Sequence, residues 1–215
     1  MSERKPAGTD TRRVGMISLG CPKNRVDSEI MLGELARQGY QITPDAEDAD
    51  TVIVNTCGFI DEAKQESIEA ILEMTAGKEE HPGRKVLVAG CMVNRYGEEL
   101  QREIPEIDGF DSLDYLGGVG VVVHIGGDPP PPSPSHVVFD HTAPRTLTTR
   151  GYAYLKVAEG CNNPCTFCAI PKWRGAFRSR TVDSLVEEAR RLEETGAVEL
   201  CLIAQDTTRY GEDLG

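Results

Sequence analysis

Three cysteines lie close together in the stretch EGCNNPCTFCAIP, where Cys161, Cys165 and Cys168 follow the order C-x3-C-x2-C. Thiolates at such short spacing can surround one metal ion or one iron–sulfur cluster. A structural zinc site usually has four protein ligands, and no fourth cysteine stands nearby in the sequence. A cluster held by only three thiolates leaves one iron open to another ligand. The spacing alone leaves both a zinc site and an iron–sulfur site open.

A second set of cysteines is spread over the first half of the chain. Cys21, Cys57 and Cys91 stand in SLGC, VNTCG and VAGC, each directly after an apolar run that predicts a buried strand. The carboxyl ends of parallel strands share one edge of an open sheet, so we expect the three thiols to converge there. Each also precedes a predicted helix, whose first N–H groups favour anionic sulfur. The alternative is that Cys21, Cys57 and Cys91 are three independent buried cysteines. The seventh cysteine, Cys201, lies within a later apolar run and is predicted to be a buried thiol that acts as a small hydrophobic residue.

Strand and helix patterns alternate along the part of the sequence that carries these cysteines. Short runs rich in β-branched residues predict strands at 14–20, 51–56 and 85–90. Helical spacing of apolar residues predicts helices at 27–39, 61–77 and 94–104. This order is typical of an α/β fold with an open parallel sheet and right-handed crossovers. Residues 118–127 are predicted to add one further strand.

A proline-rich stretch divides the sequence. GGDPPPPSPS predicts a stiff, extended linker rather than a packed element. A second strand–helix–strand pattern follows it at 152–158, 181–196 and 197–205, with Leu185, Ala189 and Leu192 on one face of the helix. We therefore expect an N-terminal domain at 1–127, a linker at 128–150 and the start of a second domain at 151–215.

Composition points to a globular protein of the cytoplasm. The first residues are polar, and no apolar run approaches the ~20 residues that cross a bilayer, so neither a signal peptide nor a membrane span is predicted. Seven cysteines, an odd number, favour metal or catalytic use over a disulfide framework. The formal charge of −12 disfavours wholesale nucleic-acid binding and fits a basic protein partner better.

Several motifs together resemble the radical S-adenosylmethionine methylthiotransferase family. EGCNNPCTFCAIP is similar to the cluster loop of radical S-adenosylmethionine enzymes, with Phe167 in the usual aromatic position before the third cysteine. SLGCPKNRVDSE, NTCGFI and GCMVNRYGEEL resemble the family's N-terminal motifs, and WRGAFRSR resembles the segment after the cluster loop. Within the family, CPKN, VDSE and AQDTTRYG are most similar to the branch that modifies a ribosomal protein.

The resemblance implies an enzyme with two four-iron, four-sulfur clusters and S-adenosylmethionine as its cofactors. By that resemblance Cys161, Cys165 and Cys168, with Phe167 beside them, hold the radical-generating cluster and its S-adenosylmethionine, and Cys21, Cys57 and Cys91 hold an auxiliary cluster. The implied reaction places a methylthio group on the β-carbon of an aspartate in small-subunit ribosomal protein twelve, with an electron donor as a further partner. No catalytic residue beyond the cluster ligands is implied.

Two other functions stay open at this stage. The first is methylthiolation of adenosine in tRNA with the same clusters, and the second is a non-catalytic metal-binding fragment. Members of the family continue through a six-stranded βα barrel, so the resemblance implies that 151–215 is only the first part of that barrel. The basic residues after the cluster loop could bind a carboxylate or could belong to a solvated loop, and they are not assigned to a site: Lys172, Arg174, Arg178 and Arg180.

Overall fold

The computed structural model describes residues 12–111 and 142–215. The strand predicted at 118–127 and the proline-rich stretch lie outside these described residues. Within them, no helix is both long enough and apolar enough to span a membrane. The first part contains five strands and three helices, which are β1 Arg13–Ser18, α1 Pro22–Arg37, β2 Gln41–Ile42, β3 Thr51–Thr56, α2 Asp61–Ala76, β4 Lys85–Gly90, α3 Cys91–Glu103 and β5 Gly109–Asp111.

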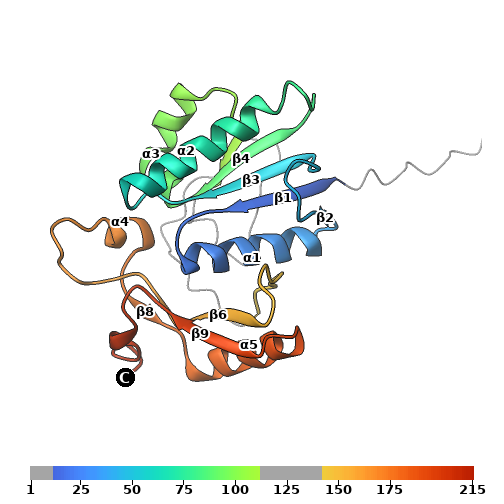
Figure 1. The fold of residues 1–215 in the computed structure, drawn as a ribbon. Helices are drawn as coiled ribbons and strands as arrows, with labels where there is room; N and C mark the ends of the chain where they lie inside the picture. The colour runs from blue at the N-terminus through green and yellow to red at the C-terminus, as the bar shows by residue number, and fades with distance from the viewer. Residues whose placement is uncertain (1–11, 112–141) are drawn as a thin grey trace, which may run out of the picture.

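The five strands form one parallel sheet in the order β2-β1-β3-β4-β5. Helix α1 covers one face of this sheet, and α2 and α3 cover the other (Figure 1). All six residues of β3 are buried, and its side chains alternate between two cores: Ile53 packs toward α1, whereas Val52 and Val54 pack toward α2 and α3. The predicted open α/β sheet is therefore confirmed.

Helix α1 is longer and more deeply buried than its sequence indicated. It begins at Pro22, five residues before the predicted start, with proline in the first turn, where its missing N–H costs no helical bond. Eleven of its residues are buried, among them Asp27, Glu29 and Glu34. The reason is visible in Figure 1, where α1 lies between the five-stranded sheet and the strands of the second part of the chain.

Helix α2 also differs from the expected pattern on its inner face. Of the apolar residues whose spacing predicted it, Ile71 is fully buried, whereas Ile68 and Leu72 are exposed. The other buried positions are Ser67, Met74 and Thr75. The hydroxyl of Ser67 accepts a hydrogen bond from the backbone N–H of Cys57 at 3.1 Å, so a polar residue on this face fixes a cysteine loop.

The second part contains β6 Tyr152–Lys156, β7 Ala158–Glu159, α4 Ile170–Arg174, β8 Arg178–Ser179, α5 Val182–Glu194, β9 Glu199–Ile203 and a 3-10 turn at Thr207–Arg209. Strands β6 and β9 pair in parallel, and β7 and β8 pair antiparallel. As predicted, Leu185, Ala189 and Leu192 of α5 face the small core over β6 and β9. Cys201 is only half-buried rather than buried, because β9 pairs with β6 alone among the described strands and its Leu202 is exposed.

Candidate functional site

The first three cysteines lie at one edge of the parallel sheet. Cys21 is the N-cap of α1, Cys57 directly follows β3, and Cys91 is the first residue of α3. Because β1, β3 and β4 are neighbours in the sheet, their carboxyl ends bring these residues together. Gly20 has a positive φ of 83°, and its α-carbon lies so near Cys57 that an added β-carbon would come within 3.0 Å of the Cys57 Sγ.

Asn24, in the first turn of α1, contacts all three of these strand ends. Its fully buried amide donates to the backbone carbonyl of Leu19 at 3.1 Å and to that of Thr56 at 2.8 Å. Its Oδ1 lies 3.8 Å from the Cys91 Sγ, which is the third contact. One side chain thus connects the residues around Cys21, Cys57 and Cys91. Its place in CPKN had suggested only a family likeness.

The second cysteine set lies on the loop between β7 and α4. Cys161 is buried, Cys168 is half-buried and Cys165 is exposed, and the neighbouring Phe167 is 87% exposed. The loop is closed by a backbone hydrogen bond from the Cys168 N–H to the Cys165 carbonyl at 3.1 Å. At its start, the Cys161 N–H donates to the Gly175 carbonyl, also at 3.1 Å. The loop therefore returns onto the segment that follows α4.

Residues after β9 hold this loop from the other side. The side-chain amide of Asn163 donates to Asp206 Oδ2 at 3.0 Å, and Arg209 donates to Asn163 Oδ1 at 3.3 Å. Asp206 and Arg209 both belong to the AQDTTRYG motif, so this motif supports the loop that carries the local cysteine triplet. The hydrogen bonds from Thr208 and Asn163 lower the pKa of Asp206, which keeps its carboxylate ionised.

A buried group of four charges joins the two parts of the chain beside Cys91. Asp27 of α1 contacts both Lys156 of β6 (2.7 Å) and Arg174 of α4 (2.9 Å). Glu159 of β7 contacts the same two cations, at 2.7 Å and 3.2 Å. Because the charges balance within the group, each can be buried without leaving a lone ion in the interior. We call Asp27, Lys156, Glu159 and Arg174 the charge quartet.

Arg174 links the charge quartet to the first cysteine set. Only 4% of the residue is exposed, and its Nη2 lies 2.9 Å from Asn24 Oδ1 and 3.6 Å from the Cys91 Sγ. Burial opposes its charged form, but Glu159 and Asp27 outweigh burial and hold its pKa well above the usual value. Burial raises the pKa of the Cys91 thiol to about 11, and the guanidinium of Arg174 acts against that rise.

The four basic residues after the local triplet therefore have different surroundings. Arg174 is buried in the charge quartet, and Arg180 is buried in an ion pair with Glu188 of α5. Lys172 is exposed to solvent. Arg178 is half-buried, and within the described residues its Nε and Nη2 have no hydrogen-bond partner; the same holds for both amide atoms of Gln205. Sequence reasoning had left all four unassigned, because a run of basic residues carries no signal of burial.

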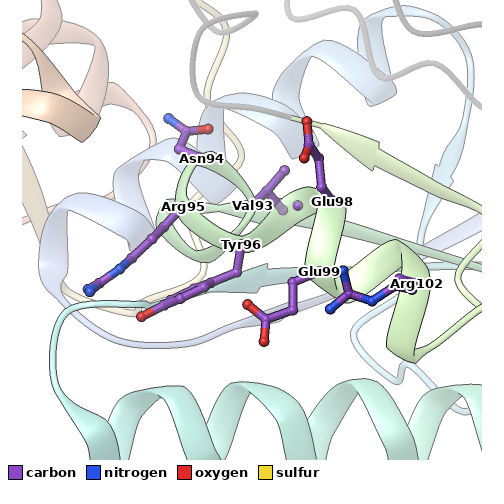
Figure 2. A pocket seen from close by; sticks show the side chains of 8 residues that line it. Val93, Asn94, Arg95, Tyr96, Glu98, Glu99 and Arg102 are labelled. Atoms are coloured by element: carbon purple, nitrogen blue, oxygen red, sulfur yellow. The ribbon is translucent and has the colours of Figure 1, made fainter.

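An open hollow of about 540 Å³ lies along α3, next to the first cysteine set in sequence. It is lined by residues 93–99 and Arg102, and none of these is a cysteine. The side chains of Arg95 and Tyr96 extend to the same side of α3, whereas Asn94 points another way (Figure 2). Asn94 donates to the backbone carbonyl of Trp173 at 3.3 Å, so α3 and α4 are joined at this point. The hollow is separate from the thiols.

The structure thus places the six predicted thiols in two groups. Cys21, Cys57 and Cys91 share the sheet edge, whereas Cys161, Cys165 and Cys168 share one loop of the second part. Within residues 12–111 and 142–215, no three Cys, His, Asp or Glu side chains lie close enough together to hold a single metal ion. The residues that sequence reasoning missed are the polar ones between the two groups, above all Asn24 and Arg174.

Comparison with known proteins matches both parts of the chain. Residues 13–111 match the uncharacterized protein family UPF0004, and residues 155–215 match the Radical SAM superfamily. Proteins described as ribosomal protein uS12 methylthiotransferase RimO are similar along nearly the whole chain. The protein from Symbiobacterium thermophilum is 53% identical over 206 residues, which are 94% of this chain and 42% of the relative.

The chain is similar to the RimO proteins along nearly its whole length. The RimO of Solibacter usitatus is 49% identical over 205 residues, and that of Aquifex aeolicus is 47% identical over 210 residues. Each alignment covers 94% of this chain and 44% or 43% of the relative. The chain therefore spans a little under half the length of these curated relatives. The resemblance that the cysteine motifs indicated is confirmed.

Proposed function

We propose that this chain carries the two cysteine sites of a radical S-adenosylmethionine enzyme that methylthiolates an aspartate of ribosomal protein uS12. The observation that carries the proposal is the position of the C-x3-C-x2-C loop, between β7 and α4 in the segment that matches the Radical SAM superfamily. The reaction and its substrate are named in the RimO relatives. An electron donor and a cytoplasmic location belong to the same proposal.

The chemistry of the thiols fits iron–sulfur clusters at both groups. In this proposal Cys161, Cys165 and Cys168 hold one four-iron, four-sulfur cluster, and Cys21, Cys57 and Cys91 hold the other. With S-adenosylmethionine bound, the first cluster would supply the 5′-deoxyadenosyl radical that removes hydrogen from the substrate. The buried and unpartnered donors of Arg178 and the amide of Gln205 suit a polar ligand near this part of the chain.

The surroundings of the local triplet favour an accessible site. Cys165 is exposed and Cys168 is half-buried, so the loop can receive a ligand from solvent. Cys161 is buried and fixed through its backbone to Gly175, and Asn163 is fixed by Asp206 and Arg209. The loop is thus held at its base and open at its tip, where Phe167 offers an apolar surface.

Iron binding tests the cofactor assignment. After anaerobic reconstitution with iron and sulfide, we expect about eight irons per chain, from two four-iron clusters. Replacing Cys161, Cys165 and Cys168 together by alanine should halve the iron content, and replacing Cys21, Cys57 and Cys91 should do the same. The half-exposed Cys201 provides the matched control, because Cys201→Ala should change nothing. Tight binding of one zinc ion instead would favour the non-catalytic metal-binding function.

Mass spectrometry of two candidate substrates tests the reaction. The chain, and the same chain joined to the remaining half of a curated relative, would be incubated with S-adenosylmethionine, a reductant, and either uS12 or tRNA. A methylthio group should replace hydrogen on the uS12 aspartate. An acidic chain is better matched to a basic ribosomal protein than to a polyanion, which agrees with this choice. Methylthioadenosine in the tRNA digest together with an unmodified uS12 peptide would overturn it.

A further inference from the structure

Two polar side chains, Asn24 and Arg174, lie between the two cysteine groups. Both are buried, and contacts within the chain satisfy their polar atoms. Asn24 is completely buried, and besides its contact with Arg174 its side chain reaches Leu19, Thr56 and Cys91. These three residues lie at or directly after the ends of different strands, which the fold brings to one edge of the sheet. The carboxamide is suited to this position because it offers two N–H donors to the carbonyls and one oxygen to the third strand end.

Arg174 extends this arrangement to the second cysteine group. Its guanidinium contacts Asn24 and Cys91 on one side and Glu159 on the other. The next residue, Gly175, accepts the backbone hydrogen bond of Cys161. The route from the Cys91 sulfur to the Cys161 backbone thus passes through one arginine and its neighbouring peptide group. Gly160 has a positive φ of 76°, and an added β-carbon there would collide with the Ala176 carbonyl, so this packing is tight.

We propose that Asn24 and Arg174 are a positioning pair that fixes the three N-terminal cysteines relative to the cluster loop and directs a positive charge at the sulfur of Cys91. The inference rests on the proposed function, because the second role concerns the group that these cysteines would hold. Neither residue needs to contact the substrate. They fix the position of the first cysteine set relative to the second, and they stabilise negative charge on the sulfur atoms of the first set.

The contacts of the Arg174 guanidinium support the second part of this proposal, that Arg174 places a positive charge beside the Cys91 sulfur. Its Nη2 carries two hydrogens but has three acceptors, namely Asn24 Oδ1 and Asp27 Oδ2 at 2.9 Å and the Cys91 Sγ at 3.6 Å. The charge quartet is neutral as a whole, but Arg174 is the member of it whose guanidinium lies at the Cys91 sulfur. Negative charge on that sulfur therefore has a cationic hydrogen-bond donor at its side, in a buried setting where water screens little.

Lysine cannot replace arginine fully at this position. The guanidinium reaches Asp27, Glu159 and Asn24 at once because its planar fork holds several donors at fixed angles. An ammonium group keeps the positive charge but lacks that fork. Arg174→Lys therefore separates the charge role from the positioning role, and Arg174→Met removes both. Lys172→Met, an exposed change on the same helix, is the matched control.

The experiment measures the reduction potential of the cluster held by Cys21, Cys57 and Cys91. All variants carry alanine at Cys161, Cys165 and Cys168, so that only this cluster is present, and electron paramagnetic resonance follows its reduction. Arg174→Met should shift the potential to a more negative value and change the resonance signature. Arg174→Lys should recover most of the potential, and Lys172→Met should match the parent. An unchanged potential in Arg174→Met would overturn the charge role.

Hydrogen exchange of the iron-free chain tests the positioning role separately. Arg174→Met and Arg174→Lys should both speed amide exchange in segments 19–24 and 160–163, which the pair connects, whereas Lys172→Met should not. Equal exchange in all variants would overturn the positioning role. If the parent chain binds no iron, the cofactor assignment and the charge role both fail, but the exchange result still decides the positioning role. If Arg174→Met does not fold, Arg174→Gln, which is polar but uncharged, replaces it in both measurements with the same expected results.

Discussion

At the scale of single residues, the charge quartet gives a direct stability prediction. Lys156 is 2% exposed and contacts Asp27 and Glu159, each at 2.7 Å. Replacing it by methionine leaves two carboxylates with one cation in a buried site. Breaking a buried pair in this way typically costs about 3–5 kcal/mol of the free energy of unfolding, and we expect a loss of that order.

Urea unfolding measures this loss, and an exposed ion pair provides the control. Arg190 pairs with Glu187 on the outer face of α5, where both side chains are largely exposed. Arg190→Met should leave the midpoint of unfolding unchanged within error, because exposed pairs contribute little. A Lys156→Met chain as stable as its parent would show that water or rearrangement compensates the lost ammonium.

The same residues show what the sequence could and could not predict. All six candidate ligands were found from cysteine spacing and from their place after apolar runs. Arg174 was noticed only as one of four basic residues, because its partners Asp27 and Cys91 lie far away in sequence. Asn24 was part of a recognised motif, but its contacts to three strand ends depend on the finished sheet. Local patterns carry no record of such long-range burial.

At the scale of elements, α1 is where prediction and structure differ most. A helix covered on both sides has polar residues at buried positions, and so its sequence lacks the single apolar stripe that marks a helix start. The strands were easier to predict from the sequence, because parallel strands that are buried on both faces consist of continuous apolar runs. The short elements β7, α4 and β8 were not predicted, since two to five residues give no measurable period.

The contact of α1 with the second part of the chain predicts the effect of a glycine substitution. At Gly33 an added β-carbon would lie 2.6 Å from the backbone carbonyl group of Pro144. Gly33→Ala should therefore destabilise the chain by about 1–3 kcal/mol, as overpacking usually does, although alanine is the better helix former. Thermal or urea unfolding would show the loss.

Gly97 of α3 is the matched control for this substitution. Its nearest neighbour would be a side-chain methyl carbon of Val93 at 3.6 Å, which is ordinary contact. Gly97→Ala should be neutral or stabilise the chain by up to about 1 kcal/mol through helix propensity. Equal effects of the two changes would mean that Pro144 does not pack against α1 in solution.

At the scale of the whole molecule, the two parts of the chain share a buried polar interface. Glu29 of α1 accepts hydrogen bonds from the backbone and hydroxyl of Thr148 and forms an ion pair with Arg145, and Arg145 also contacts Glu188 at 2.6 Å. Residues 142–150, which the sequence assigned to a linker, thus contact α1. We propose that the domain boundary lies within 128–141, and that α1 serves both domains.

This interface predicts how the chain behaves after a single cut. The sequence by itself predicts only two barrel strands after the proline-rich stretch, and two strands cannot close a barrel, so on this ground alone the second part should be degraded after cleavage. The buried contacts of Glu29 and Arg145 now predict a different result. With a protease site inserted within 128–141, the two fragments should remain associated in gel filtration, because buried ion pairs are screened only weakly by salt.

Substitutions at the interface then separate its contribution from that of the remaining contacts. Arg145→Met leaves Glu29 and Glu188 buried without their shared cation, so the cut fragments should dissociate and the second fragment should become protease-sensitive. Arg190→Met is the control, because Arg190 pairs with Glu187 on its own helix and both side chains are largely exposed. Fragments of the parent chain that separate at once would show that the covalent connection, rather than the buried charges on α1, holds the two parts together.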